Sequence, residues 1–316
     1  MQFGFGAGLM YGIRTDLAGQ TPIRFGAMQD ISIEFNGELK ELYAQSQFAI
    51  DAARGKVKIM GKAKMAQISA VAFNTIFFGG TLNDGQTLSA YNEPATTPAA
   101  YTTVATSAGS IIGATVLTFA SVPGPVAAGQ LVNDSTAPGA VAPGTLVVSK
   151  TGTTVTIDKP LIGAVTTADS INFYTPVVPA NQATFSADLG VYYGASGTPL
   201  SYTTGAPTLA GTYTEIGGKY FFSNQDDAVN VLINYIYTVT TGYTLIAGNP
   251  FMGTTPKFMG VFSSTYEANS IVMQLYACVS TKLTMPTKID DYTIPELDFS
   301  AYQNAAGQTV DLFMNT

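Results

Sequence analysis

One stretch, residues 54–65, constrains the fold of this chain more than any other. Its odd positions carry small or apolar residues, and its even positions carry five of the fourteen basic residues of the chain: Arg54, Lys56, Lys58, Lys62 and Lys64. Successive side chains of a β-strand point to opposite faces, so this alternation predicts a strand with one basic face and one apolar face. At about 3.3 Å per residue the strand extends for roughly 40 Å, which exceeds the usual strand length.

The flanking segments predict another strand and a short helix. Upstream, Ile31, Ile33 and Phe35 alternate with polar residues, as in a half-buried strand. Downstream, Ser69 is a typical helix N-cap, and the pair at 79–80 is Gly-Gly, a typical helix end. The residues between these points are almost all apolar, so we expect a helix that is buried on most sides against a sheet.

The middle of the chain, residues 101–176, differs from the rest in composition. It is rich in Thr, Ala, Val, Gly and Pro, and it holds few charged residues. Short strand candidates recur between Pro-Gly turn signals, at residues 115–119, 145–150, 153–158 and 171–174. Short strands separated by turns predict a small all-β module.

The composition argues against catalysis and metal binding. The chain contains no histidine and one cysteine, Cys278, which we expect to be a buried, inert thiol. Histidine is the commonest general base, and zinc sites are built largely from histidine and cysteine. The acidic pairs at 226–227 and 290–291 are adjacent in sequence, so in a strand their carboxylates would point to opposite faces. We therefore expect no catalytic residue, no cofactor and no metal.

Charge and hydropathy limit the partners further. The net charge of −7 argues against binding duplex DNA by counterion release, although DNA can slide past a wall of like charge. No apolar run approaches ~18 residues, so we expect no membrane insertion. The first residues have no basic start before an apolar stretch, so no signal peptide is expected.

Several segments resemble bacteriophage tail tube proteins, also called major tail proteins. The resemblance lies in the order and pattern of GELKELYAQSQFAIDAARGKVKIMGKAKMAQISAVAFNTIFFG, KYFFSNQDDAVNVLINYIYT, GNPFMGTTPKFMGVF and KLTMPTKIDDYTIPELDFSAYQNAAGQTVDLF. These segments cover most of residues 20–100 and 177–316. The resemblance implies a mainly β fold: a β-sandwich or barrel core with one short flanking helix. It also favours strand and loop over helix for residues 37–48.

The resemblance further implies a structural role. Residues 1–100 and 177–316 would be the two halves of the tube core, and residues 101–176 would be a small inserted β-sandwich-like domain on the outside. Such subunits assemble in the bacterial host cytoplasm into hexameric rings, which stack into the tail tube of the virion. The implied partners are other copies, other tail proteins (sheath or terminator, and tape measure) and double-stranded DNA that passes without specific binding. The alternative is a β-rich surface or adhesion protein of the virion that binds host glycans through residues 101–176.

The row of cations leaves three interpretations open. Lysines protect an exposed edge strand against aggregation, or the cations face DNA in the lumen, which is less favoured because bound phosphate would retard ejection. In the third interpretation the cations Arg54, Lys56, Lys58, Lys62 and Lys64 meet acidic surface on a second sheet or on a neighbouring subunit, where the candidate acids are Asp290, Asp291, Glu296 and Asp298. Exposed ion pairs contribute ~0–1 kcal/mol each, so they would set register more than affinity. The glycine-rich residues 1–24 predict a terminal arm that docks on a neighbouring subunit.

Overall fold

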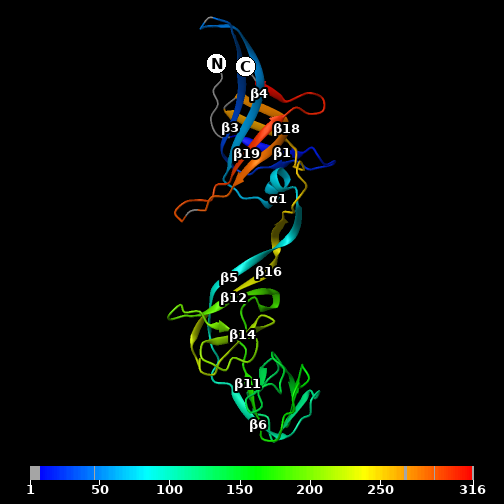
Figure 1. Ribbon diagram of the computed structural model, residues 1–316, viewed down its shortest axis with the longest axis vertical. Coiled ribbons are helices and arrows are strands. Elements are labelled where there is room, and N and C mark those ends of the chain that lie inside the picture. Colours follow the sequence, from blue (N-terminus) through cyan, green and yellow to red (C-terminus); the bar gives the residue numbers. More distant parts are fainter. Residues whose placement is uncertain (1–7, 46, 267–268, 288, 315–316) are drawn as a thin grey trace. The chain divides into compact units, whose positions relative to one another are not determined.

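The structure is a computed structural model that describes residues 8–45, 47–266, 269–287 and 289–314 (Figure 1). Strands account for 54% of the chain and helices for 4%, which confirms the prediction of a mainly β fold with one short helix. The chain forms two compact units. Unit 1 comprises Met1–Asp84 with Tyr243–Thr316, and unit 2 comprises Gly85–Gly242.

Unit 1 is built on one eight-stranded sheet, in the order β2-β1-β17-β18-β19-β4-β3, with β20 also paired to β18. The strands are β1 (Leu9–Arg14), β2 (Ile23–Arg24), β3 (Met28–Tyr43), β4 (Ala49–Met65), β17 (Phe258–Tyr266), β18 (Asn269–Thr284), β19 (Glu296–Tyr302) and β20 (Val310–Met314). All pairings are antiparallel. Because β1 pairs with β17 and β4 with β19, the two ends of the sequence form this sheet together.

A short helix covers one face of the sheet. It consists of α1 (Ala70–Phe73) followed by a π-helical turn, η1 (Asn74–Phe78). The Ser69 hydroxyl accepts a hydrogen bond from the N–H of Ala72 at 3.3 Å, and Gly79 ends the helix with φ +60°, which glycine adopts without strain. Ile76 is fully buried, and its carbonyl accepts a hydrogen bond from the Ser280 hydroxyl at 2.6 Å. The predicted start and end of the helix are confirmed.

The core of unit 1 lies between the helix and the sheet. The odd residues of β4 from Ile59 to Met65 are buried, and the even residues between them are exposed or half-buried, which confirms the predicted alternation for this part of the strand. Cys278 is fully buried in the same core, and burial raises the pKa of its thiol to about 12. The reactive thiolate is therefore not formed at neutral pH.

The start of the described chain belongs to the sheet. Strand β1 pairs with β17 along its whole length and buries Met10 in the core. A Cβ at Gly12 would lie 2.5 Å from the ring of Phe25, so the strand packs closely against its neighbour. Residues 1–7 of the predicted terminal arm lie outside the described residues, and residues 9–14 are a core strand instead of an arm.

Unit 2 contains three smaller sheets, two of which have three strands. One has the order β12-β16-β5, and the other has the order β13-β14-β15. The elements are β5 (Thr81–Thr96), η2 (Gln182–Thr184), β12 (Phe185–Tyr193), β13 (Ser201–Tyr202), β14 (Thr212–Ile216), β15 (Lys219–Phe222) and β16 (Asn230–Ile246). The two sheets share a core in which the buried Tyr213 and Tyr220 donate hydrogen bonds to Asp188, at 2.5 and 2.9 Å.

The third sheet of unit 2 has six strands, in the order β8-β11-β6-β7-β10-β9. The strands are β6 (Thr102–Ala108), β7 (Val116–Phe119), β8 (Leu131–Asp134), β9 (Val147–Lys150), β10 (Thr154–Ile157) and β11 (Ser170–Tyr174). All six lie within residues 101–176 and enclose a core of their own. A small cluster of Leu131, Tyr174 and Phe221 packs this segment against the rest of unit 2. Unit 2 spans residues 85–242, and the separate six-stranded sheet with its core lies within the residues 101–176 expected for the inserted domain.

Candidate assembly surface on the β3–β4 hairpin

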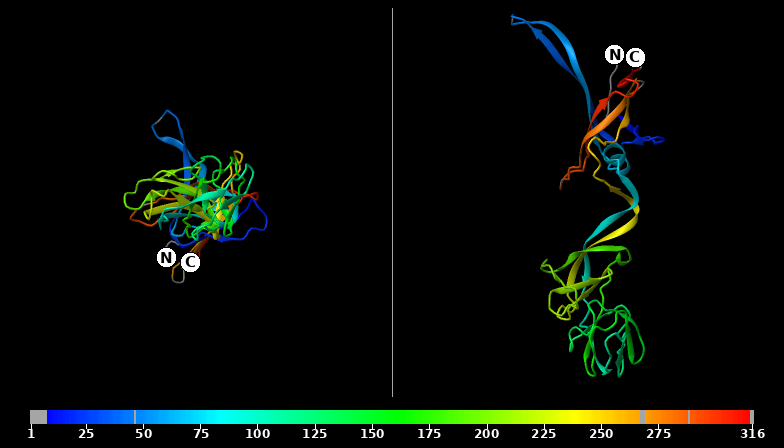
Figure 2. Two further views of the ribbon diagram at one scale, coloured as in Figure 1. Left: turned by 90° about the horizontal axis from the view of Figure 1, so that it is seen from below. Right: turned by 45° about the vertical axis from the view of Figure 1, so that its right-hand side comes forward.

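The β3–β4 hairpin extends beyond the other strands of unit 1 (Figure 2). Strand β19 pairs with β4 only between Ile59 and Lys64, whereas β3 and β4 remain paired as far as Tyr43 and Ala49. We call residues 35–58 the outer hairpin. Its described residues are all exposed, apart from the half-buried Gly55.

Strand β3 lies at the edge of the sheet. An edge strand presents a row of N–H and C=O groups that can pair with a strand of another chain. Over the outer hairpin this edge belongs to a ribbon of two strands, and an isolated two-stranded ribbon is only marginally stable in water. The outer hairpin therefore has a strand edge that can pair with another chain, and such pairing would stabilise it.

A β-bulge in β4 decides which face Arg54 occupies. Gly37 lies opposite Val57 and Leu39 lies opposite Arg54, so β4 has one residue more than β3 between these two pairs. Residues opposite one another in a ladder share a face, which places Arg54 on the face of Val57 and Leu39. In agreement, a Cβ at Gly37 would lie 2.9 Å from Nε of Arg54. The predicted row of five cations on one face is wrong for Arg54, because the bulge breaks the period of two.

The face that carries Arg54 is apolar from Phe35 to Leu39, and the exposed Glu41, two residues further along β3, lies on it as well. This face includes Phe35, Leu39 and Val57, each of them exposed. These residues continue the side of the hairpin on which Ile31 and Ile33 pack against the core of unit 1. We call Phe35, Leu39 and Val57 the apolar face. The sequence predicted an apolar face that includes Val57 and the alternation that ends at Phe35, but it assigned no contact role to Phe35, Leu39 or Val57.

The opposite face of β4 carries Lys62 and Lys64. Strand β4 lies between β3 and β19, and both of these strands have acidic residues opposite one or both lysines. On β3, Asp30 lies opposite Lys64. On β19, Glu296 lies opposite Lys64, and Asp298 lies opposite Lys62. The Glu296 carboxylate contacts Nζ of Lys62 at 3.1 Å and Nζ of Lys64 at 3.6 Å. The hydrogen bond between Lys62 and Glu296 lowers the pKa of the Glu296 carboxyl and raises the pKa of Lys62.

Four of the predicted contact residues are thus neighbours in one sheet: Lys62, Lys64, Glu296 and Asp298. Their contact with acids of another subunit stays a prediction, but within the chain Lys62 and Lys64 already have an acidic partner in Glu296. The physical reason is the pairing of β4 with β19, which places residues from distant parts of the sequence directly opposite each other.

The other members of the cation row lie on the outer hairpin. Lys56 lies at the bulge, and Lys58 lies opposite Asn36. Both are exposed, and in the described part of the chain neither of them, nor Arg54, forms an ion pair. These three cations are available to a partner.

The remaining predicted acids, Asp290 and Asp291, lie in the loop between β18 and β19. Asp291 accepts a hydrogen bond from the N–H of Tyr292 at 2.8 Å. Both acids are exposed, as are the bulky side chains of Ile289 and Tyr292 on either side. The loop therefore combines negative charge with apolar surface, which complements Lys56, Lys58 and the apolar face of the outer hairpin.

Among the residues that the structure describes, no group of three or more His, Cys, Asp or Glu could hold a metal ion. In the same residues, no helix has the length and apolar character needed to span a membrane. Comparison of the chain with protein-family models and with curated protein sequences finds no match.

Proposed function

We propose that the protein is the tube subunit of a bacteriophage tail, in which hexameric rings stack into a conduit for genome ejection. The sequence resemblance to tail tube proteins is one support. The structural observation that carries the proposal is the outer hairpin, which leaves its apolar face, its strand edge and three cations exposed.

Burial of the apolar face supplies the driving force for self-association. Removing apolar surface from water contributes about 25 cal/mol per Å², so fully covering a half-exposed Leu or Phe contributes on the order of 1 kcal/mol. A partner that covers the hairpin also orders a ribbon that is marginal by itself. Both effects act in the same direction.

Among the described surfaces, the best complement to the outer hairpin is the β18–β19 loop of a second copy. Its Asp290 and Asp291 match the charge of Lys56 and Lys58, and its exposed Tyr292 offers apolar surface. The hairpin and the loop are different surfaces of one chain, so the contact is heterologous. A heterologous contact generates a ring when its rotation closes and a stacked or helical array when it does not.

The charge of the chain suits a conduit. Each copy carries a net charge of −7, so a ring of copies repels the phosphate backbone and does not retain DNA. In this function the protein needs no catalytic residue or cofactor. Its place is the tail of the virion, built in the bacterial host cytoplasm, with the sheath or terminator and the tape measure protein as neighbours.

Negative-stain electron microscopy of the purified protein tests the proposal. We expect rings or tubes with a central hole to appear as the protein concentration rises. The double variant Lys56→Glu/Lys58→Glu should remain folded by circular dichroism but lose these assemblies. The control Lys150→Glu/Lys159→Glu makes the same charge change in unit 2 and should still assemble. Monomers of the unaltered protein at every concentration would overturn the proposal.

A further inference from the structure

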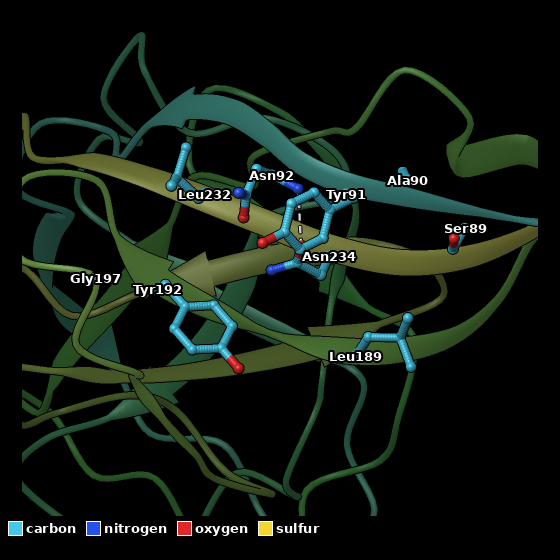
Figure 3. Close-up of a pocket in the computed structure, with 9 residues that line it drawn as sticks. All are labelled: Ser89, Ala90, Tyr91, Asn92, Leu189, Tyr192, Gly197, Leu232 and Asn234. Carbon is cyan, nitrogen blue, oxygen red and sulfur yellow. Dashed lines mark hydrogen bonds between the residues drawn. The ribbon is translucent and has the colours of Figure 1, made fainter. Parts of the chain in front are cut away.

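A hollow on the three-stranded sheet of unit 2 has a lining that points to a ligand (Figure 3). Its volume is about 510 Å³, within the ~300–1,000 Å³ range of small-molecule sites. Residues of β5, β12 and β16 line it, together with Gly197. None of the lining residues is charged. A neutral ligand is therefore favoured.

The floor of the hollow is organised by Asn234 of the central strand, β16. This side chain is only 4% exposed. Its Oδ1 accepts a hydrogen bond from the N–H of Asn92 on β5 at 2.7 Å. Its Nδ2 donates a hydrogen bond to the carbonyl of Gly190 on β12 at 3.2 Å. One buried amide thus ties both outer strands to the middle of the sheet.

Both outer strands depart from regular geometry at this amide. On β5, Asn92 has φ +55°, which is uncommon for a residue other than glycine. On β12, the register shifts between Asp188 and Gly190, and Gly190 has φ +100°. Bulges and left-handed residues cluster at binding sites, where they aim side chains that a regular strand would point elsewhere.

Aromatic rings rise on either side of this floor. Figure 3 shows Tyr91 projecting from β5 and Tyr192 from β12, with Asn234 of the central strand between them. Both rings are exposed, and their hydroxyls make no hydrogen bond to another described residue. The same holds for the side-chain amide of Asn92. The hollow therefore offers two ring faces together with unused donors and acceptors.

We propose that this hollow binds a neutral oligosaccharide. A pyranose ring has an apolar face of C–H groups, which stacks on tyrosine, and an edge of hydroxyls, which hydrogen-bonds to amide and phenol groups. An aliphatic ligand would leave the amide and the phenols unused, and an anionic ligand would find no positive charge. The hollow lies outside residues 101–176, where the sequence suggested a glycan-binding alternative. The inference does not depend on tube formation.

Saturation-transfer NMR tests the inference, with maltotriose, cellotriose and chitotriose as separate probes. We expect transfer to the ring protons of at least one of the three. Tyr91→Ala and Tyr192→Ala should each reduce that signal at least fivefold. Asn92→Gly keeps the left-handed backbone and its hydrogen bond to Asn234, and it should also reduce the signal because the side-chain amide is lost.

The control is Tyr243→Ala, because Tyr243 is 50% exposed, between the 36% of Tyr192 and the 82% of Tyr91, but belongs to unit 1 and does not line the hollow. This variant should leave saturation transfer unchanged. Circular dichroism of each variant verifies that the fold is retained. Absence of transfer to all three sugars would overturn the inference, as would transfer in Tyr91→Ala and Tyr192→Ala equal to that of the unaltered protein.

Discussion

Gly61 of β4 lies opposite Phe299 of β19, beneath the phenylalanine ring. A Cβ at Gly61 would lie 2.1 Å from Cζ of Phe299. The ring is 1% exposed and belongs to the core of unit 1. The missing side chain at position 61 is therefore the space that the ring fills.

Replacing Gly61 by alanine should lower the free energy of unfolding by about 1–3 kcal/mol, because the ring must leave its position or the strands must separate. Urea unfolding followed by tyrosine fluorescence measures this, since the chain has no tryptophan. The control is Gly248→Ala, also in unit 1, where no atom lies within 4 Å of the new Cβ. It should change stability by less than about 1 kcal/mol. Equal losses in the two variants would contradict the packing argument.

The side-chain carboxyl of Glu296 should have a pKa below the ordinary glutamate range, because Lys62 and Lys64 favour its charged form. A folded pKa below the unfolded value means that the ion pairs stabilise the protein above the unfolded pKa. This stabilisation is lost as the pH falls through the folded pKa. Carboxyl ¹³C NMR should show a higher midpoint for Glu296 in Lys62→Met. Identical midpoints would show that Lys62 does not act on this carboxyl.

Cys278 should resist a thiol reagent in the folded protein at pH 8 and react once urea unfolds the chain. Burial keeps the thiol protonated, with its pKa raised to about 12, and also excludes the reagent. Replacement by serine should lower the free energy of unfolding by about 1–3 kcal/mol, since the hydroxyl enters an apolar core. Cys278→Ala separates this polar cost from the loss of volume. Rapid labelling of the native protein would contradict the burial.

Leu39→Glu should abolish assembly while leaving the monomer folded, because the new charge lies on the apolar face of the outer hairpin. The matched control is Leu209→Glu in unit 2, since Leu39 is 62% exposed and Leu209 is 66% exposed. Sedimentation velocity gives the size distribution of both variants, and circular dichroism reports their folding. If Leu39→Glu still formed rings, the apolar face would have no part in the contact.

Local features of the fold could be predicted from the sequence, because they depend on neighbouring residues. Ser69 and Gly79 mark the helix, since a cap and a left-handed stop act within one turn. The alternation from Ile59 to Met65 marks the buried face of β4, since a strand in a one-sided sheet has a period of two.

Features that depend on distant residues could not be predicted. The pairing of β4 with β19 gives Lys62 an acidic neighbour in its own chain, and nothing in either segment specifies that ladder. The bulge near Gly55 moves Arg54 to the apolar face, although the residue types expected for the two faces of a strand alternate without interruption from 54 to 65. The reach of unit 2 from 85 to 242 also depends on packing, because the cluster around Phe221 joins segments that differ in composition.

Strand β4 pairs with β19, which is synthesised much later than β4. Translation produces β4 before unit 2, and it produces unit 2 before β17 to β20. Until β19 is synthesised, Lys64 has no Glu296 opposite it, and Gly61 has no Phe299 ring above it. Until then the eight-stranded sheet that carries the outer hairpin is incomplete, because β17 to β20 supply four of its strands.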